Sequence, residues 1–310
     1  MVDHRASPPN EATKRWLERM CGGVPRRFRG LGGGSSADVW EFSIDAGATL
    51  ARFVVKQPRP VVALQHPDLV AREVVALDAA SAVDVGTPEI VAVDEDGSET
   101  EIPTIVTRRI PGRVELAPSD LGRWLRRFAD SLVAVHEAPS SSLTALPRYA
   151  PFHEIEWVVR PSWIDERAFA RLRSRATESL AVDAPEALVH RDFQPYNVLW
   201  SRGAIVGVVD WVETCRGPGG ADVGHATWNL AALFGADAAF DFVHRYERAS
   251  ETVVDQGWLA VGALDAIELP LGIPGQAASA GRADVTTDSV VRRLSDYVER
   301  LSAGGRQSRA

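Results

Sequence analysis

Two short acidic segments, 190–197 and 208–211, limit most strongly what this chain can fold into. The first reads His-Arg-Asp-Phe-Gln-Pro-Tyr-Asn and the second Val-Val-Asp-Trp. They place Asp192, then Asn197 five residues later, then Asp210 at the end of an apolar run. Phosphoryl transfer from ATP needs such a set, because one carboxylate orients the proton of the acceptor hydroxyl while an amide oxygen and a second carboxylate hold magnesium. The pattern therefore predicts a type of reaction and a loop followed by a hairpin.

Composition narrows the class of protein. The chain has 310 residues, enough for two lobes with separate cores, and its 45% hydrophobic and 25% charged residues are typical of soluble globular proteins. It lacks an apolar run of membrane-spanning length, and residues 1–13 lack the apolar core of a signal peptide. Cys21 and Cys215 make neither a disulfide framework nor a metal cluster. We expect a cytoplasmic protein without a membrane span.

The net charge of −8 bears on the partners. Broad nucleic-acid binding needs a basic footprint, which this chain lacks, so we expect no nucleic-acid partner. An acidic surface favours cationic small molecules. The expected partner is a small hydroxylated acceptor, with a cationic one favoured, bound by a monomer or a homodimer.

The first third of the chain has the pattern of a β-rich lobe with one helix. Strands are expected over 26–31, 38–44, 50–56, 90–94 and 104–107, because short apolar or alternating runs are separated by turn residues. The spacing of apolar residues predicts the helix over 67–80. The glycine-rich stretch 32–36 lies between the first two strands and is expected to be a loop.

The remainder is predicted to be mostly helical. Helices are expected over 119–137, with Ser119 as N-cap, over 152–179 with a break near Pro161, and over 222–234, 236–248, 252–267 and 287–301. A hairpin of strands 197–200 and 204–209 interrupts them. This order predicts an α+β, protein-kinase-like fold of two lobes. The domains would be an N-terminal extension and first helix (1–25), a nucleotide-binding lobe (26–108), a hinge (109–118), a helical lobe with the acceptor site (119–301) and a disordered tail (302–310).

Nucleotide contacts are predicted in the first lobe. Gly33, Gly34, Ser35 and Ser36 carry little side chain, so their backbone N–H groups can approach phosphates, although glycine triplets also occur in ordinary loops. Lys56 ends a strand and either lies in solvent or contacts the α- and β-phosphates. The second role needs a carboxylate to hold the amine, and Glu73 in the following helix supplies one.

The second lobe supplies the remaining candidates. Asp210 follows a buried strand, where a carboxylate is costly unless it is paired or bound to metal, so a helix cap or a salt bridge is the alternative to magnesium. His190 is expected to bond nearby backbone. Asp222 either caps the helix that it begins or braces the backbone of the loop around Asp192. Substrate contacts are predicted for Glu213, Glu154 and Trp157, and Glu213 is also a candidate for the magnesium site. A solvated helical face explains Glu154 equally well, and core packing is the more frequent role of a tryptophan such as Trp157.

These residues resemble the aminoglycoside phosphotransferase family, a group of kinase-like small-molecule phosphotransferases. The matching pieces are 31–36, 54–56, 72–73, 110–112, 189–200, 207–211 and 219–230. The resemblance implies that Asp192 is the catalytic aspartate, that Asn197 and Asp210 bind Mg²⁺, that Lys56 holds the triphosphate, and that the backbone around Thr107, Arg108 and Ile110 binds adenine. The cofactors would be ATP, with GTP possible, and Mg²⁺.

The family's substrates leave the acceptor open. Its members phosphorylate hydroxyls of antibiotics, which gives antibiotic resistance, or of metabolites such as choline, homoserine and methylthioribose. The chain departs from the family pattern at Gln194, where many members have histidine, at Arg108 and Arg109, where an acid is common, and at Ser36. These departures put substrate and nucleotide preference in question.

Two other functions fit less well. A protein kinase needs a long activation segment after the second aspartate, yet only eleven residues separate Asp210 from Asp222 and no Ala-Pro-Glu follows. A nucleotide-binding regulator without turnover would have lost catalytic groups, whereas Lys56, Asp192, Asn197 and Asp210 are all present. We therefore predict an ATP-dependent O-phosphotransferase acting on an aminoglycoside or another antibiotic, with a metabolic small-molecule kinase as the alternative.

Overall fold

The fold is described from a computed structural model that covers residues 8–31, 36–46, 49–267 and 272–304. The chain divides into two compact units. The first comprises residues 1–81 and 87–111, and the second comprises residues 82–86 and 112–310. Each unit is described by itself.

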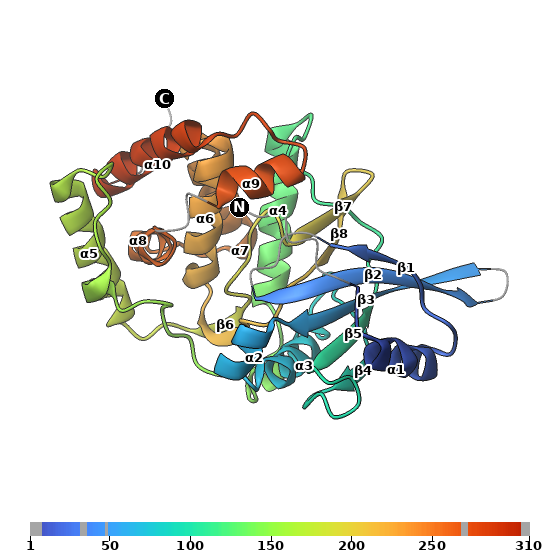
Figure 1. The fold of residues 1–310 in the computed structure, drawn as a ribbon. Helices are drawn as coiled ribbons and strands as arrows, with labels where there is room; N and C mark the ends of the chain where they lie inside the picture. Colours follow the sequence, from blue (N-terminus) through green and yellow to red (C-terminus); the bar gives the residue numbers. More distant parts are fainter. Residues whose placement is uncertain (1–7, 32–35, 47–48, 268–271, 305–310) are drawn as a thin grey trace. The chain divides into compact units, whose positions relative to one another are not determined.

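The first unit is built on one antiparallel sheet (Figure 1). Its strands are β1 (Arg26–Gly30), β2 (Ala37–Ala46), β3 (Thr49–Pro58), β4 (Ile90–Asp94) and β5 (Thr104–Arg108), in the order β1-β2-β3-β5-β4. Alternate residues of β2, namely Trp40, Phe42 and Ile44, are buried on one face, as the period of two along a strand requires. Phe42 stacks on Phe53 of β3 with ring centroids 5.3 Å apart. All five strands lie where the sequence predicts strands.

The first unit also carries helices α1 (Glu11–Cys21), α2 (Pro60–Gln65) and α3 (Leu69–Ala80). The side chain of Asn10 caps α1 by accepting from the backbone N–H of Thr13, and Trp16 of this helix is buried in the core of the sheet. The prediction of one helix after the second long strand is wrong, because α2 precedes α3. Pro60 begins α2, which buries none of its residues and so has no amphipathic pattern to detect.

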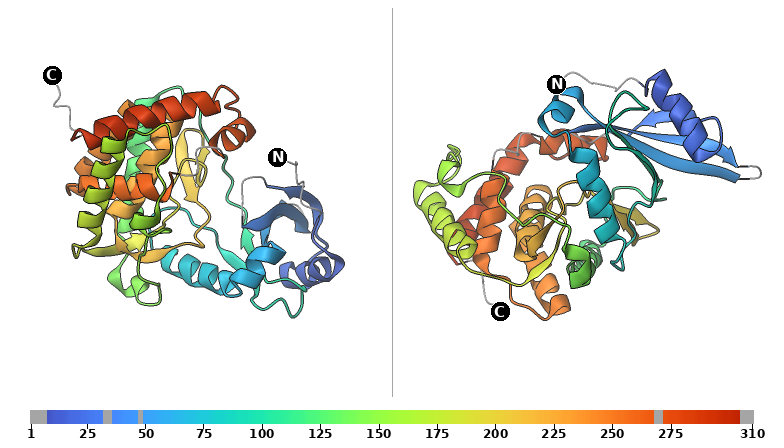
Figure 2. Two further views of the ribbon diagram at one scale, coloured as in Figure 1. Left: turned by 60° about the vertical axis from the view of Figure 1, so that its left-hand side comes forward. Right: turned by 90° about the horizontal axis from the view of Figure 1, so that it is seen from below.

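The second unit is mostly helical. Its helices are α4 (Leu121–His136), α5 (Glu166–Leu180), α6 (Gly220–Phe234), α7 (Ala236–Ser250), α8 (Gln256–Asp265), α9 (Ile273–Ser279) and α10 (Thr287–Ser302), with 3-10 turns η1 (Ser140–Leu143) and η2 (Ile155–Trp157). Helix α8 packs between α5 and α6, and α10 lies against both (Figures 1 and 2). Among the residues that the structure describes, no helix is long and apolar enough to cross a membrane.

Two small antiparallel sheets lie among these helices. Strand β6 (Glu186–Val189) pairs with β9 (Cys215–Pro218), and β7 (Val198–Ser201) pairs with β8 (Ala204–Val208) as the predicted hairpin. The β6–β9 pair was not predicted, because each strand has four residues and its partner lies on the far side of the hairpin. The segment 190–197 therefore begins at the end of one small sheet and ends at the start of the other.

Several predicted helix limits in this unit are wrong. Asp120, not Ser119, caps α4, since its carboxylate accepts from the backbone N–H of Arg123. In the predicted helix 152–179, only the turn η2 forms before Asp165 caps α5. Helix α8 begins after its cap Asp255 rather than at residue 252. Helix α9 is not among the predicted helices, because Pro274 in its first turn favours a loop in the sequence pattern.

Aromatic side chains fix the hairpin and the loop to α4. Trp124 of α4 stacks on Phe128, 4.9 Å between centroids, and on Trp200 of β7, 5.2 Å between centroids. Phe128 in turn contacts the ring of Phe193, with 4.8 Å between centroids, and Phe193 is fully buried within the segment 190–197. The buried Phe193 therefore anchors this segment to α4.

Candidate active site

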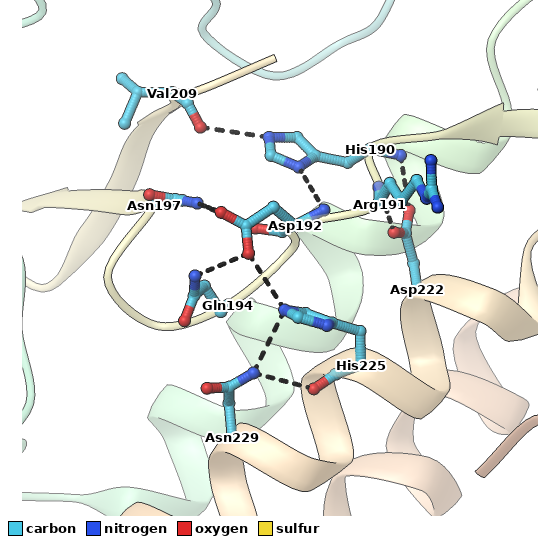
Figure 3. Close-up of polar contacts among 9 residues, drawn as sticks. All are labelled: His190, Arg191, Asp192, Gln194, Asn197, Val209, Asp222, His225 and Asn229. Atoms are coloured by element: carbon cyan, nitrogen blue, oxygen red, sulfur yellow. Dashed lines mark hydrogen bonds and ion pairs between the residues drawn. The ribbon is translucent and has the colours of Figure 1, made fainter. Parts of the chain in front are cut away.

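The carboxylate of Asp192 is the centre of a hydrogen-bond network (Figure 3). Its Oδ1 accepts from Nε2 of Gln194 at 2.7 Å and lies 3.0 Å from Nε2 of His225, and its Oδ2 accepts from Nδ2 of Asn197 at 2.7 Å. The Asp192 side chain is 29% exposed, so the carboxylate is held by the protein and remains within reach of a ligand.

Asn197 is oriented by the same loop. Its Nδ2 donates to the backbone oxygen of Asp192 at 2.9 Å as well as to Oδ2 of that residue. Both hydrogens of the amide are thus used within the loop, and Oδ1 is the ligand atom that this side chain can present. Its backbone oxygen accepts from the N–H of Val209 at 2.9 Å, which ties the loop to the residue before Asp210.

Asp210 follows β8 in a left-handed backbone conformation, with φ of 67°. Non-glycine residues adopt this region rarely, and such residues are concentrated at functional sites. The buried Trp211 fixes the turn, because its Nε1 donates to the oxygen of Val208 at 2.9 Å. Since Val198 pairs with Val208 across the hairpin, Asn197 and Asp210 flank the same end of it. The structure therefore brings the two predicted metal ligands to one end of one hairpin.

Asp222 braces the backbone of the loop. Its fully buried carboxylate accepts from the N–H of His190 at 2.8 Å and of Arg191 at 2.6 Å, and lies 3.1 Å from Nε2 of His136. Burial acts to raise the pKa of Asp222, but the hydrogen bond and charge of His136 and the donors at His190 outweigh it and lower that pKa. Asp222 does not cap α6, whose N-cap is Gly219. Of the two predicted roles, bracing is the one that forms.

His190 is a structural residue, as expected. Its Nε2 is 3.1 Å from the oxygen of Val209, and its Nδ1 accepts from the N–H of Asp192 at 3.2 Å. Burial is the largest effect on its pKa and lowers it, despite the nearby carboxylates of Asp222, Asp192 and Asp210. A neutral ring with the proton on Nε2 satisfies both contacts.

The predicted ion pair of the first unit is present. Nζ of Lys56, on β3, lies 3.1 Å from Oε1 and 3.0 Å from Oε2 of Glu73, which is buried in α3. Both side chains are largely shielded, with 14% and 10% exposure, so water screens their attraction less than at the surface. The lysine is therefore held in a fixed position at the end of its strand.

The other predicted nucleotide contacts are less defined. Gly33, Gly34 and Ser35 lie outside the described residues, and the oxygen of Ser36 accepts from the N–H of Arg59 at 2.9 Å. Thr107 pairs with Val54 in the sheet. Arg108 forms an ion pair with Glu89 at 3.1 Å, and Ile110 follows strand β5. Their role at adenine stays a prediction.

The predicted substrate contacts separate into two places. Glu213 lies 3.9 Å from Arg191, whose guanidinium stacks 3.7 Å from the ring centroid of Phe152. Glu154 and Trp157 lie at η2, and Trp157 is 78% exposed. Within the described part of the chain, Glu213 is the one of these three with a contact to the loop of Asp192. Trp157 is therefore not packed in the core, which was the alternative role for it.

Two residues of the network were missed in the sequence. His225 and Asn229 lie on α6, one and two turns after Asp222. Nδ2 of Asn229 donates to the backbone oxygen of His225 at 3.1 Å and lies 3.2 Å from its Nε2. Steps of three and four residues place Asp222, His225 and Asn229 on one face of the helix, and that spacing of polar residues in an otherwise apolar helix was the available signal.

Comparison with known proteins gives the family. A model of the phosphotransferase enzyme family matches residues 27–264, which is more than half of the chain. The chain belongs to this family. The predicted resemblance and the predicted class, a phosphotransferase enzyme, are confirmed. A search of curated proteins found no match.

Solved structures of the family share the fold. A thermostable mutant of aminoglycoside phosphotransferase APH(4)-Ia, solved with AMP-PNP and hygromycin B, is 19% identical with a TM-score of 0.60 over 92% of this chain and 99% of that one. Macrolide 2'-phosphotransferase MphH from Brachybacterium faecium is 18% identical with a TM-score of 0.56 over 92% and 98%. Spectinomycin phosphotransferase APH(9)-Ia, solved with ADP and spectinomycin, is 14% identical with a TM-score of 0.57 over 96% and 99%. The predicted α+β, kinase-like fold is confirmed.

Proposed function

We propose that this phosphotransferase uses ATP and Mg²⁺ to phosphorylate a hydroxyl group of a small-molecule antibiotic. The observation that carries the proposal is the carboxylate of Asp192, which Gln194, His225 and Asn197 hold in one orientation while it stays partly exposed. Support for the substrate class comes from the solved relatives named for hygromycin B, macrolides and spectinomycin. The AMP-PNP and ADP in two of those structures support the nucleotide.

Asp192 is the proposed catalytic residue. Its carboxylate accepts a hydrogen bond from the acceptor hydroxyl and so aims the oxygen at the γ-phosphorus of ATP. As the new P–O bond forms, the bond from the γ-phosphorus to the ADP oxygen breaks, and the hydroxyl proton passes to Asp192 and then to solvent. Such reactions gain most of their rate from positioning and charge stabilisation. This agrees with a carboxylate whose orientation is fixed by hydrogen bonds.

Asn197 and Asp210 are the proposed ligands of Mg²⁺. An amide oxygen and a carboxylate are the hard ligands that this ion prefers, and proteins commonly supply only one or two of them because phosphate oxygens and water complete the shell. The bound ion would neutralise charge on the triphosphate. For the first unit, the proposed role of Lys56, held by Glu73, is to contact a triphosphate.

A small acceptor is supported by the chain after Asp210. The chain after Asp210 forms the short strand β9, which pairs with β6, and then enters α6 at Gly220. Little chain is therefore left between Asp210 and α6 to bind a peptide. A protein kinase needs additional chain here to bind a peptide. The low cysteine content supports a further proposal, a cytoplasmic location. The monomer or homodimer stays a prediction.

The test is a screen for ADP release from ATP with aminoglycosides, macrolides, spectinomycin, choline and amino alcohols as acceptors. We expect turnover with at least one antibiotic, and Asp192→Ala should lower kcat by at least about 100-fold while nucleotide binding survives. Asp183→Ala, at an exposed aspartate just before β6, is the matched control. Full turnover by the Asp192 variant would contradict the assignment, and turnover with choline alone would favour a metabolic kinase.

A further inference from the structure

The two oxygens of Asp192 have different surroundings. Each carboxylate oxygen has two in-plane lone pairs. Oδ1 meets two side-chain partners, Nε2 of Gln194 at 2.7 Å and Nε2 of His225 at 3.0 Å, whereas Oδ2 meets Nδ2 of Asn197 at 2.7 Å. Oδ1 is thus saturated by protein groups, and Oδ2 keeps one lone-pair direction for a ligand.

We propose that His225 is a positioning residue that saturates Oδ1 of Asp192 and thereby makes Oδ2 the oxygen that receives the proton of the acceptor hydroxyl. This inference rests on the proposed function and assigns the reacting atom within it. His225 would not touch the substrate. It would act through Asp192 by fixing the rotation of the carboxylate.

The position of His225 is set by one rigid helix. Asp222 of α6 holds the backbone of the loop at His190 and Arg191, and His225 holds its side chain one turn further along the same helix. Helix α6 is closely packed on α8, because a Cβ at Gly224 would lie 2.1 Å from the backbone oxygen of Trp258. The imidazole therefore has little freedom to move away from Asp192.

The protons on the imidazole decide whether the contact is attractive. With a proton on Nε2, His225 donates to Oδ1 of Asp192, and the amide of Asn229 keeps its bond to the backbone oxygen of His225. Without that proton, Nε2 can accept from Nδ2 of Asn229 at 3.2 Å, but its lone pair then faces the carboxylate of Asp192. The positioning role requires the first state.

The surrounding charges favour that state. Burial acts to lower the pKa of His225, but the hydrogen bond and charge of Asp192, with the charges of Asp222 and Asp265, outweigh it and raise that pKa above its usual value of 6.5. Arg191 and Tyr149 line the same small cavity as His225 and Asp265. Below the raised pKa the ring carries both protons. Above it, the neutral ring divides between tautomers, and the fraction that donates to Asp192 falls.

The experiment compares His225→Leu, which removes the donor, with His225→Gln, whose amide can place an N–H near the position of Nε2 and does not titrate. We expect His225→Leu to lower kcat by about 10-fold to 100-fold, the usual effect of removing a partner that orients a reacting group. KM for ATP should change by less than about twofold, because Asp192 is assigned to the acceptor hydroxyl and not to the nucleotide. His225→Gln should recover most of the lost kcat. His244→Gln, at a partly exposed histidine on α7, is the control.

The pH profile of kcat separates positioning from a merely structural role. The wild type and His244→Gln should lose part of kcat as pH rises through the raised pKa of His225, above 6.5. His225→Gln should lack that step. Wild-type kcat in folded His225→Leu, or the same alkaline step in His225→Gln, would overturn the inference.

A second measurement needs no turnover and separates this inference from the proposed function. NMR titration should show that the pKa of the His225 imidazole falls when Asp192→Asn removes the carboxylate charge. An unchanged pKa would overturn the contact between the two side chains. A wild type inactive on every acceptor, with the NMR shift present, would count against the proposed function and leave the contact established.

Discussion

The buried carboxylate of Asp222 accepts a hydrogen bond from the backbone N–H of Arg191 at 2.6 Å, at a residue whose φ is 71°. A left-handed arginine is a costly backbone conformation, so the surrounding structure has to impose it. Asp222 does so together with His136, which lies 3.1 Å from the same carboxylate. The aspartate thus fixes the chain direction immediately before Asp192.

Removal of this carboxylate should destabilise the protein. Asp222→Ala leaves His136 and two backbone N–H groups buried without their acceptor, and we expect a loss of about 3–5 kcal/mol in the free energy of unfolding. Asp237→Ala is the matched control, because Asp237 lies in the first turn of α7 but is 94% exposed in its ion pair with Arg300. It should cost less than about 1 kcal/mol. Urea unfolding at pH 7 measures both, and equal losses would contradict the bracing role.

Asp222 should also affect how the free energy of unfolding falls at acid pH. The pKa of folded Asp222 lies below that of an unfolded aspartate, about 3.9, so the unfolded state binds more protons between the two values. Its stabilisation is therefore complete above about pH 5 and is lost as pH falls through the folded pKa. Urea unfolding between pH 6 and pH 3 should give a smaller decline for Asp222→Asn than for the wild type. A parallel decline would show that the carboxylate pKa is not lowered on folding.

The sequence predicted the parts of the site that lie close together along the chain. Asp192, Asn197 and Asp210 share one loop and one hairpin, so their spacing carries most of their geometry. The pair of Lys56 and Glu73 followed from a strand end and the next helix. His225 could not be assigned in this way, because nothing local ties a histidine in an apolar helix to an aspartate in an earlier loop. The packing of α6 creates that contact.

Prediction of the helices and strands likewise succeeded where the signal is local to the sequence. Strands with alternating apolar residues, such as β2, and long amphipathic helices, such as α4, were found within a few residues of their limits. Four short helices and strands were not: α2 buries no residue, α9 has seven residues with Pro274 in its first turn, and β6 and β9 have four residues each and pair across an intervening hairpin. Such elements exist because of their tertiary partners, and local propensity gives little signal for them.

The ion pair between Lys56 and Glu73 predicts an effect on kcat/KM for ATP. If Glu73 holds Lys56 against the triphosphate, Lys56→Met and Glu73→Gln should each lower kcat/KM for ATP by about 10-fold to 100-fold, the equivalent of one charged hydrogen bond. Lys14→Met removes a partly exposed lysine that pairs with the exposed Glu11, and it should leave kcat/KM unchanged. Steady-state kinetics with varied ATP decide the matter. A wild-type value in Glu73→Gln would show that the pair serves stability only.

The stack of Trp200 on Trp124 predicts a large loss of stability when the indole ring of Trp200 is removed. Trp200 is 3% exposed and stacks on Trp124, so Trp200→Ala should leave a cavity and cost about 3–5 kcal/mol. Trp157→Ala, at a tryptophan that is 78% exposed, should change stability by less than about 0.5 kcal/mol. Thermal unfolding of both variants is the measurement. A small loss in Trp200→Ala would mean that the hairpin is not anchored by this stack.

The contact between α6 and α8 predicts that a single methyl group disturbs the site. A Cβ at Gly262 would lie 2.1 Å from the backbone carbon of Gly224, and neither backbone can yield without moving a helix. Gly262→Ala should therefore cost about 1–3 kcal/mol by overpacking. It should also lower kcat, because α6 carries Asp222 and His225. Gly122→Ala, in the first turn of α4, meets only ordinary contacts of 3.5 Å and beyond and should be neutral or stabilising by up to about 1 kcal/mol. Thermal unfolding and kcat measured on both variants test the coupling, and a destabilised Gly262→Ala with wild-type kcat would show that α6 can shift without disturbing Asp192.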